Sequence, residues 1–183
     1  MSFIQEPVTA QLSRMASREV DRVLWQEYIT FAENEAHVYR DTSPAQHLTV
    51  SAFIFDTELE QILLCFHRKG RFWVQLGGHI EESDLSLASA SRREAEEESG
   101  LDIVTLERPT PVDLDRHALT SGFGSCQVHW DIGFAFTADR AAVPVASDES
   151  ERVAWWPVSA LPDGSVPGLY QRVLRVVRIL REE

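Results

Sequence analysis

One run of the chain, residues 77–101, constrains the fold most, because two adjacent glycines precede a segment dense in glutamate. Gly77 and Gly78 can adopt backbone angles closed to other residues, so they predict a sharp turn that approaches a ligand closely. The following segment is predicted to be a helix, and Gly100 stands where a left-handed cap would end it. The apolar side of this predicted helix consists of Leu85, Leu87, Ala88, Ala90 and Ala95.

The predicted helix carries three glutamates on one face. Glu94, Glu97 and Glu98 fall at positions i, i+3 and i+4. Like charges at this spacing repel and cost an isolated helix about 0.2–0.5 kcal/mol per pair. The cluster therefore predicts either a solvated acidic face or a site for a hard, oxygen-seeking cation such as Mg2+. Glu96 lies off this face and is expected to point to solvent.

The run resembles the Nudix box, the signature of the Nudix hydrolases. Its common form is Gly, five residues, Glu, seven residues, Arg-Glu, an apolar residue, any residue, Glu-Glu, any residue, Gly and an apolar residue. The segment Arg93–Leu101 fits this form at every position. Asp84 departs from it, because it stands where the family has Glu, and eight residues rather than seven separate it from Arg93. Leu76 also stands where many relatives have Pro.

The resemblance implies a hydrolase that uses Mg2+ or Mn2+ to cleave a nucleoside diphosphate linked to a further group X. It implies Glu97 and Glu98 as metal ligands, and Glu94 as a third ligand or as the acceptor that orients water. The backbone carbonyl of Gly78 is expected as an additional ligand. Arg93 is expected to pair with a carboxylate of the box and to hold it in place.

The general base is expected outside the box. Glu149 is the first candidate, because its segment resembles the acidic loop that precedes Trp-aromatic-Pro in many relatives. His117, His129 and Asp131 are further candidates for contacts with substrate or metal. A lone histidine is more often a structural residue than a ligand.

Three residues between the second predicted strand and the box are candidates for substrate binding. Arg68 and Arg71 can bind phosphate, although a solvated turn explains them equally well. Trp73 can stack on a base, but aromatic residues at a strand edge more often belong to the core.

Strand patterns alternating with two strong helices predict an α/β fold with a mixed sheet and helices on both faces. This agrees with the α/β/α sandwich that the Nudix resemblance implies over about Leu48–Pro162. We divide the chain into an N-terminal helical extension (residues 1–44) and a Nudix domain (residues 45–183). The expected strands are Leu48–Phe55, Glu60–Arg68, Trp73–Leu76, Val112–Leu114, Gln127–Thr137 and Glu151–Trp156.

Three further segments complete the prediction. An amphipathic helix is expected over Ala16–Glu35, ahead of a breaker at Asp41–Pro44. Thr120–Ser125 is expected to be a mobile loop. A last helix is expected over Gly168–Arg181, where four arginines at spacing three (Arg172, Arg175, Arg178 and Arg181) are interpreted as a solvated ridge.

Composition limits the function classes. The formal net charge of -12 argues against a general nucleic-acid binder, but metal ions can screen a nucleotide-sized substrate locally. Cys65 and Cys126 lack CxxC spacing, so they are interpreted as two buried, reduced thiols rather than a zinc site or a disulfide framework. The opening residues are unlike a leader and no apolar run could span a membrane, so we expect a cytoplasmic protein. The expected partner is a small nucleotide-like molecule, and a homodimer stays open.

Two other functions compete with hydrolysis. Asp84 and the extra residue before Arg93 allow a Nudix-fold module that binds a nucleotide without cleaving it. An isoprenoid diphosphate isomerase needs a catalytic cysteine, whereas Cys65 lies in an apolar strand and looks structural. ADP-ribose, sugar nucleotides, dinucleoside polyphosphates and oxidised nucleotides all remain open as substrates.

Overall fold

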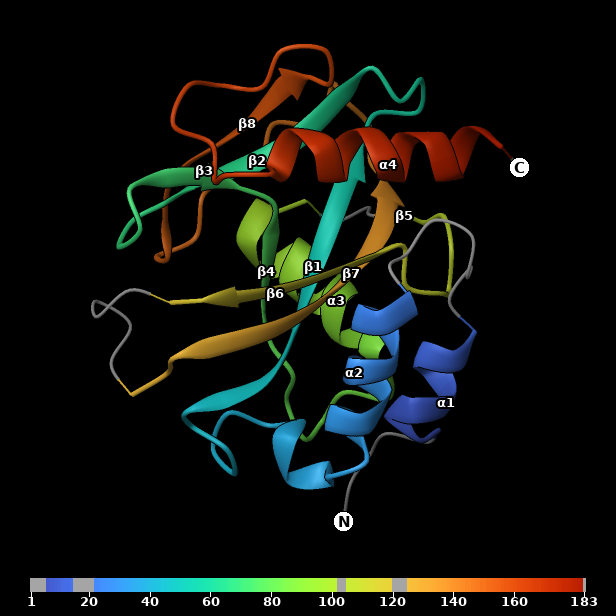
Figure 1. Ribbon diagram of the computed structural model, residues 1–183. Helices are drawn as coiled ribbons and strands as arrows, with labels where there is room; N and C mark the ends of the chain where they lie inside the picture. The colour runs from blue at the N-terminus through green and yellow to red at the C-terminus, as the bar shows by residue number, and fades with distance from the viewer. Residues whose placement is uncertain (1–5, 15–21, 102–104, 120–124, 183) are drawn as a thin grey trace.

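The computed structural model describes residues 6–14, 22–101, 105–119 and 125–182. These residues form one eight-stranded sheet with helices packed against both faces (Figure 1). The helices are α1 (Val8–Ser13), α2 (Arg22–Ala32), the short 3-10 helix η1 (Glu35–His37), α3 (Leu87–Ser99) and α4 (Leu169–Arg181). The strands are β1 (Gln46–Phe55), β2 (Gln61–His67), β3 (Phe72–Val74), β4 (Leu76–His79), β5 (Thr105–Leu106), β6 (Asp113–Ala118), β7 (Val128–Thr137) and β8 (Ser150–Pro157).

Strand β1 organises the sheet. It runs parallel to β7 along its whole length, from the pair Gln46 and Val128 to the pair Phe55 and Thr137. It also pairs antiparallel with β2 and β4, and β6 pairs antiparallel with β7. Every residue of β1 after Gln46 is buried, because helices cover both faces of the sheet. Its second half, Ala52–Phe55, is a continuous apolar run, as is typical of a strand covered on both faces, whereas polar and apolar residues alternate in its first half.

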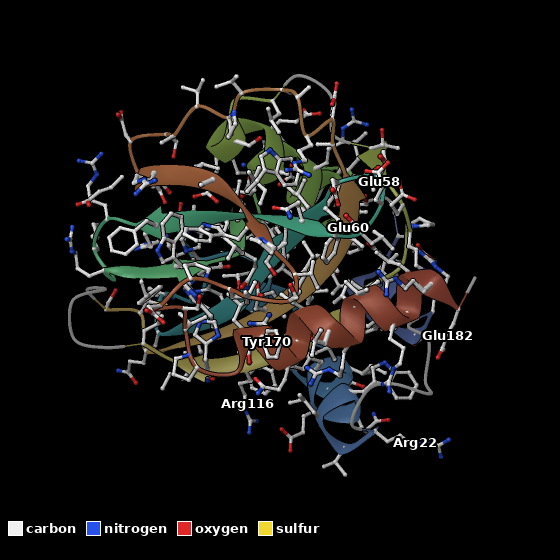
Figure 2. The ribbon with its side chains drawn as sticks, turned by 90° about the horizontal axis from the view of Figure 1, so that it is seen from above. Arg22, Glu58, Glu60, Arg116, Tyr170 and Glu182 are labelled. Atoms are coloured by element: carbon white, nitrogen blue, oxygen red, sulfur yellow. The ribbon has the colours of Figure 1, made fainter. Side chains whose placement is uncertain are left out.

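The two faces of the sheet bury separate apolar clusters. On one face, Val50, Ala52 and Ile54 pack with residues of α1, α2 and α3. On the other, Phe53 and Phe55 pack with α4. In Figure 1, α4 crosses one face of the sheet and α3 lies behind it. The turn between β1 and β2 carries Glu58 and Glu60 into solvent (Figure 2).

The expected α/β class, with a mixed sheet and helices on both faces, is confirmed. The expected strand Trp73–Leu76 is two strands, since β3 pairs with β2 and β4 with β1. Strand β6 extends beyond the expected Val112–Leu114, through polar residues that give no apolar signal. Short β5 was not predicted. Part of the expected helix Ala16–Glu35 and most of the expected loop Thr120–Ser125 lie outside the described residues.

The solvated ridge expected on the last helix is wrong for Arg172. This side chain is buried and donates to Asp113 at 2.7 Å, Asp115 at 3.0 Å and Asp131 at 3.4 Å. Arg175 adds a second hydrogen bond to Asp113, at 3.1 Å. The arginine spacing predicted the helix but could not reveal acidic partners on distant strands.

Helix α2 packs directly onto the sheet. Tyr28 is fully buried, and its hydroxyl donates to the backbone carbonyl of Asp131 at 3.0 Å. Phe31 stacks on Trp130, with ring centroids 4.2 Å apart. The division of the chain at residue 44 stays a prediction, but α2 contributes to the same apolar cluster as β1 and β7. No helix among the described residues is both long and apolar enough to cross a membrane.

Replacing Tyr28 should test how much α2 stabilises the sheet. Tyr28→Ala removes a buried ring, so we expect the free energy of unfolding to fall by about 3–5 kcal/mol, as for other large core residues. Urea denaturation measures the change. The matched control is Val23→Ala on the same helix, because Val23 is 67% exposed and should shift the value by no more than about 0.5 kcal/mol. Equal effects of the two substitutions would contradict the packing of α2.

Candidate active site

The sharp turn expected at Gly77 and Gly78 is wrong, because both residues lie within strand β4, paired with Ser51 and Val50 of β1. They bring the backbone of this strand against two carboxylates of α3. The amide of Gly77 donates to a carboxylate oxygen of Glu98 at 2.7 Å. Gly77 has a φ of 152°, and a Cβ there would lie 2.3 Å from the carbonyl oxygen of Val50. A Cβ on Gly78 would lie 2.5 Å from a carboxylate oxygen of Glu94. A side chain at Gly77 would collide with the backbone of β1, and one at Gly78 would displace the carboxylate of Glu94.

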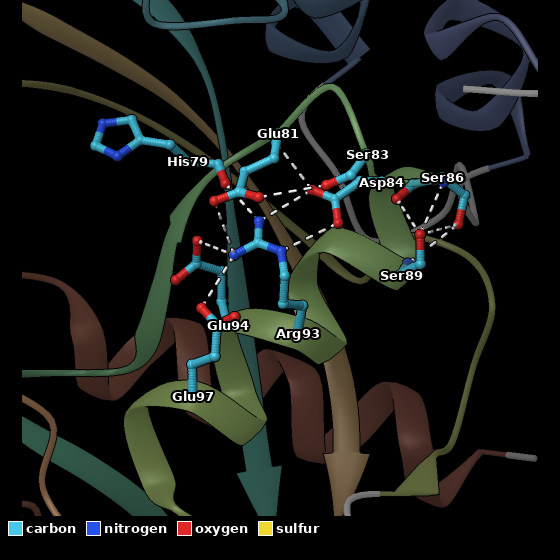
Figure 3. A network of polar contacts seen from close by, with 9 residues as sticks. All are labelled: His79, Glu81, Ser83, Asp84, Ser86, Ser89, Arg93, Glu94 and Glu97. Atoms are coloured by element: carbon cyan, nitrogen blue, oxygen red, sulfur yellow. Dashed lines mark hydrogen bonds and ion pairs between the residues drawn. The ribbon is translucent and has the colours of Figure 1, made fainter. Parts of the chain in front are cut away.

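Arg93 is the centre of a polar network that includes β4, α3 and the segment between them, residues 80–86 (Figure 3). Its guanidinium makes two hydrogen bonds to Asp84, at 3.1 and 2.9 Å, in the fork geometry that suits a carboxylate. It also donates to Glu94 at 2.9 Å, to Glu97 at 3.2 Å and to the carbonyl of His79 at 2.9 Å. One side chain therefore joins β4, the loop after it and α3.

Asp84 keeps its contact with Arg93 although both its type and its spacing depart from the family pattern. It is buried, and it also accepts a hydrogen bond from the amide of Glu81 at 2.9 Å. Helix α3 begins after Ser86, whose side chain and that of Ser89 form a capping box. Asp84 lies before this cap, so the loop accommodates the extra residue and α3 stays regular.

The three glutamates of α3 lie in different environments. The Glu98 side chain is buried, that of Glu94 is 15% exposed, and that of Glu97 is 60% exposed. Arg93 pairs with Glu94 and Glu97, whereas no basic side chain among the described residues pairs with Glu98. Glu96, as expected, lies on the outer side of the helix and pairs with Arg92 at 2.9 Å.

Electrostatics single out Glu98. Burial raises the pKa of its carboxyl to about 8, and the negative charges of Glu94 and Glu149 act in the same direction. Burial also raises the pKa of Glu94, although Arg93 opposes the shift. A cation between these carboxylates would offset the cost of burying them, so the site suits a divalent metal ion on chemical grounds.

Glu149 lies close enough to the box to interact electrostatically with Glu94 and Glu98. Its side chain is exposed, and its carbonyl accepts a hydrogen bond from the amide of Arg68 at 3.0 Å. The guanidinium of Arg68 in turn donates to the carbonyl of Ser150 at 3.2 Å. Arg71 is exposed and pairs with Glu151 on β8. Arg68 follows β2, Arg71 precedes β3 and Glu149 precedes β8, so the expected base and the two expected phosphate-binding arginines lie at neighbouring strand ends.

Two other candidates belong to the core. Trp73 is 6% exposed and packs edge-on against Trp156, with ring centroids 5.2 Å apart, so its packing favours a structural role over base stacking. Cys65 is also buried, and burial raises the pKa of its thiol to about 12. A thiol in that state is a poor nucleophile, which argues against an isomerase with Cys65 as the catalytic cysteine. Cys126 is only partly buried, so the interpretation of two buried thiols is wrong for this residue.

One face of the sheet carries a cluster of polar residues. Some of them were candidates singly, but the sequence did not predict that they lie together. The register aligns three rows of residues across strands β4, β1, β7 and β6. The rows are Gly77, Ser51, Gly133 and Asp113; then His79, Thr49, Asp131 and Asp115; then His47, His129 and His117. Polar residues at every second position in three separate strands were the available signal.

Asp131 lies at the centre of this polar face and is almost completely buried. Its carboxylate accepts hydrogen bonds from Thr49 at 3.0 Å, Ser51 at 2.6 Å and Gln75 at 3.4 Å. Arg172 also donates to it, at 3.4 Å. Burial raises the pKa of Asp131, and the charge of Arg172 opposes that shift. These contacts give Asp131 a structural environment rather than an open one.

Comparisons with known proteins place this geometry in a family. The sequence matches the NUDIX domain over residues 45–176, well over half of the chain. The chain therefore belongs to the Nudix family of hydrolases. Members of this family generally use divalent metal ions and act on small nucleotide-like substrates. None of the curated proteins matches the sequence.

Solved structures share the fold. A hydrolase of the NUDIX family from Clostridium perfringens is 24% identical with a TM-score of 0.61, over 73% of this chain and 97% of that one. An Ap4A hydrolase from C. elegans is 11% identical with a TM-score of 0.60, over 76% and 99%. The E. coli dihydroneopterin triphosphate pyrophosphohydrolase is 14% identical with a TM-score of 0.56, over 74% and 96%. At these identities the likeness concerns the fold.

The raised pKa of Glu98 predicts a pH-dependent stability for the protein without metal. The carboxyl ionises near 4.5 in the unfolded chain and near 8 in the folded one. Between these values the folded state holds the extra proton, so the free energy of unfolding should fall as pH rises, by up to about 1.4 kcal/mol per pH unit. Urea denaturation in EDTA measures this slope.

Glu98→Gln removes the titrating group and should reduce the slope, whereas Glu96→Gln, which changes an outer residue of the same helix, should leave it intact. An identical slope in the wild type and the Glu98→Gln variant would contradict the assignment of the shift to Glu98.

Proposed function

We propose that the protein hydrolyses a nucleoside diphosphate linked to a further group X, in a reaction that depends on Mg2+ or Mn2+. Water attacks one phosphorus atom, and a phosphate-bearing group leaves. The buried carboxylate of Glu98 is the observation that carries this proposal, since it accepts from the Gly77 amide and has no basic partner among the described residues. A buried carboxylate without a counter-charge is costly, and a hard cation is the partner that carboxylate oxygens suit.

The residues that would hold the cation are Glu94, Glu97 and Glu98, together with the carbonyl of Gly78. A divalent cation bound there screens the charge of the phosphoryl oxygens and activates the attacking water. Arg93 positions this group, because its hydrogen bonds fix Glu94 and Glu97 on one side and Asp84 on the other.

Glu149 is the proposed general base, which takes a proton from the attacking water. Its exposed carboxylate is accessible to water, and its negative charge contributes to the raised pKa of Glu94 and of Glu98. Arg68 and Arg71 are proposed to bind phosphate on the same side, near β8. His129 lies on the polar face of the sheet, in register with His47, whereas the alternate residues of β1 and β7 pack against α3, so His129 is left out of the proposed substrate site. Trp73 is left out of the proposed substrate site because it is buried.

The alternative, a module that binds a nucleotide without cleaving it, rested on Asp84 and the extra residue of the box. Asp84 pairs with Arg93 through two hydrogen bonds, and α3 keeps its cap and its glutamates. These contacts favour hydrolysis. The net charge of -12 supports a small substrate rather than nucleic acid, and a homodimer stays open.

Removing a carboxylate of the box should abolish hydrolysis while the fold is kept. In a phosphate-release screen over a nucleotide panel with Mg2+ or Mn2+, we expect Glu98→Gln and Glu97→Gln to lower kcat by about 100-fold or more. The matched control is Glu96→Gln, which changes the outward glutamate of the same helix and should keep full activity. Unchanged turnover in both Glu97→Gln and Glu98→Gln would reject the assignment, and tight nucleotide binding without turnover in the wild type would favour the binding module.

The base can be tested separately. Glu149→Gln removes the proton acceptor, so kcat should fall by roughly 10²–10⁴-fold at neutral pH. The loss should shrink as pH rises, because hydroxide needs no general base. Asp148→Asn is the matched control, since its side chain is also exposed in the same segment. A rate for Glu149→Gln that equals that of Asp148→Asn at every pH would exclude Glu149 as the base.

A further inference from the structure

Strand register brings several imidazoles together at one end of the polar face. His47 on β1 lies opposite His129 on β7, and their ring centroids are 5.1 Å apart. His79 on β4 lies 5.1 Å from the ring of His47 and 5.7 Å from that of His129. Cys126, two residues before β7, joins the same group.

The donor atoms of three of these residues converge. One ring nitrogen from each of His47 and His129 and the sulfur of Cys126 all lie within 4.8 Å of one another. The sulfur is 3.9 Å from Nε2 of His47. In a tetrahedral zinc site, with bond lengths of about 2.3 Å to sulfur and 2.0–2.1 Å to nitrogen, such atoms would be roughly 3.4–3.6 Å apart. The donor atoms exceed these separations by no more than about 1.4 Å, so the side chains must move towards one another to close the site.

The local contacts already orient one of these ligands. Nδ1 of the buried His47 lies 3.0 Å from the carbonyl of Ser43, so this nitrogen carries the proton. The lone pair is then on Nε2, which lies 3.9 Å from the sulfur of Cys126, while Nδ1 lies 4.0 Å from it. A histidine ligand is commonly held in this way, by a carbonyl at its other nitrogen. Within the described part of the chain the ring of His129 has no hydrogen bond, so its nitrogens are available.

We propose that His47, Cys126 and His129 bind a borderline-soft divalent cation, with Zn2+ as the best match. Two imidazoles and a thiolate suit Zn2+, whereas Mg2+ prefers the oxygen ligands of the glutamate cluster. The site is separate from the carboxylates of α3 and does not depend on the proposed hydrolysis.

The surroundings limit how the site is completed. His79 flanks both histidine ligands, but its ring nitrogens do not converge with theirs, so the fourth ligand would be a water or His79 after a change of its side-chain position. His117 also contacts the ring of His129, but its Nδ1 is engaged with Asp115 at 3.0 Å. A bound ion would join the start of β1 to the segment just before β7, and it would stabilise the folded chain in proportion to its affinity.

Metal binding by the full chain tests this proposal. Reduced, metal-free protein is titrated with Zn2+ against a chromophoric chelator, in excess Mg2+ to occupy the oxygen ligands. We expect one Zn2+ per chain, a Tm raised by Zn2+, and a thiolate charge-transfer band when Co2+ replaces Zn2+. Cys126→Ser and His129→Asn should each weaken Zn2+ binding by at least about tenfold and Cys126→Ser should remove the band.

Two controls keep the result specific. Cys65→Ala removes the other thiol, and Glu98→Gln alters the glutamate cluster; both should bind Zn2+ like the wild type. Circular dichroism checks that each variant is folded. Zn2+ affinity unchanged in folded Cys126→Ser, or lost in Glu98→Gln, would overturn the proposal.

Discussion

The parallel pairing of β1 with β7 is the constraint on which the rest of the structure depends. Its ten residue pairs fix which side chains face α3 and which face α4, because neighbours along a strand point to opposite faces. A shift of one residue would move Val50, Ala52 and Ile54 to the polar face of the sheet and would bury Thr49 and Ser51 among the apolar residues that face α3. On its other edge β1 pairs with β4, and this pairing sets the place where Gly77 and Gly78 meet α3.

The charges of the box are distributed unevenly, and this gives the site its character. Arg93 is shared by Asp84, Glu94 and Glu97, so these acids are held in place with their charges partly balanced. Glu98 is the deepest of the group and receives a backbone amide instead. The guanidinium of Arg93 thus fixes the geometry of the site, while the carboxylate of Glu98 has no positively charged partner among the described residues. This division of roles is consistent with a metal-dependent hydrolase, where ligand positions must be set before the metal binds.

Local patterns were predictable from the sequence, and long-range contacts were not. The segment Arg93–Leu101 revealed the box, the helix and the cap at Gly100, because all three depend on residues a few positions apart. Helical spacing also placed Glu94, Glu97 and Glu98 together, but it could not tell that Glu98 lies under β4 while Glu97 faces solvent. That difference depends on how α3 packs against the sheet.

The same limit explains the errors. Arg172 was interpreted as solvated because its partners lie 41 to 59 residues away, on β6 and β7. The thiol of Cys126 and the ring of His47 are 79 residues apart in the chain, so no local spacing pointed to a common site. In both cases strand register, rather than motif spacing, makes the contact.

The ion pairs of Arg172 also bear on the order in which the core closes. Asp113, Asp115 and Asp131 come from strands that precede α4 in the chain, whereas both arginines that pair with Asp113 are on α4. Until that helix docks, the face of the sheet holds carboxylates without their guanidinium partners, and burying them in that state is strongly unfavourable. The face therefore keeps its water until α4 arrives, so that docking of the helix and drying of the sheet are a single cooperative event.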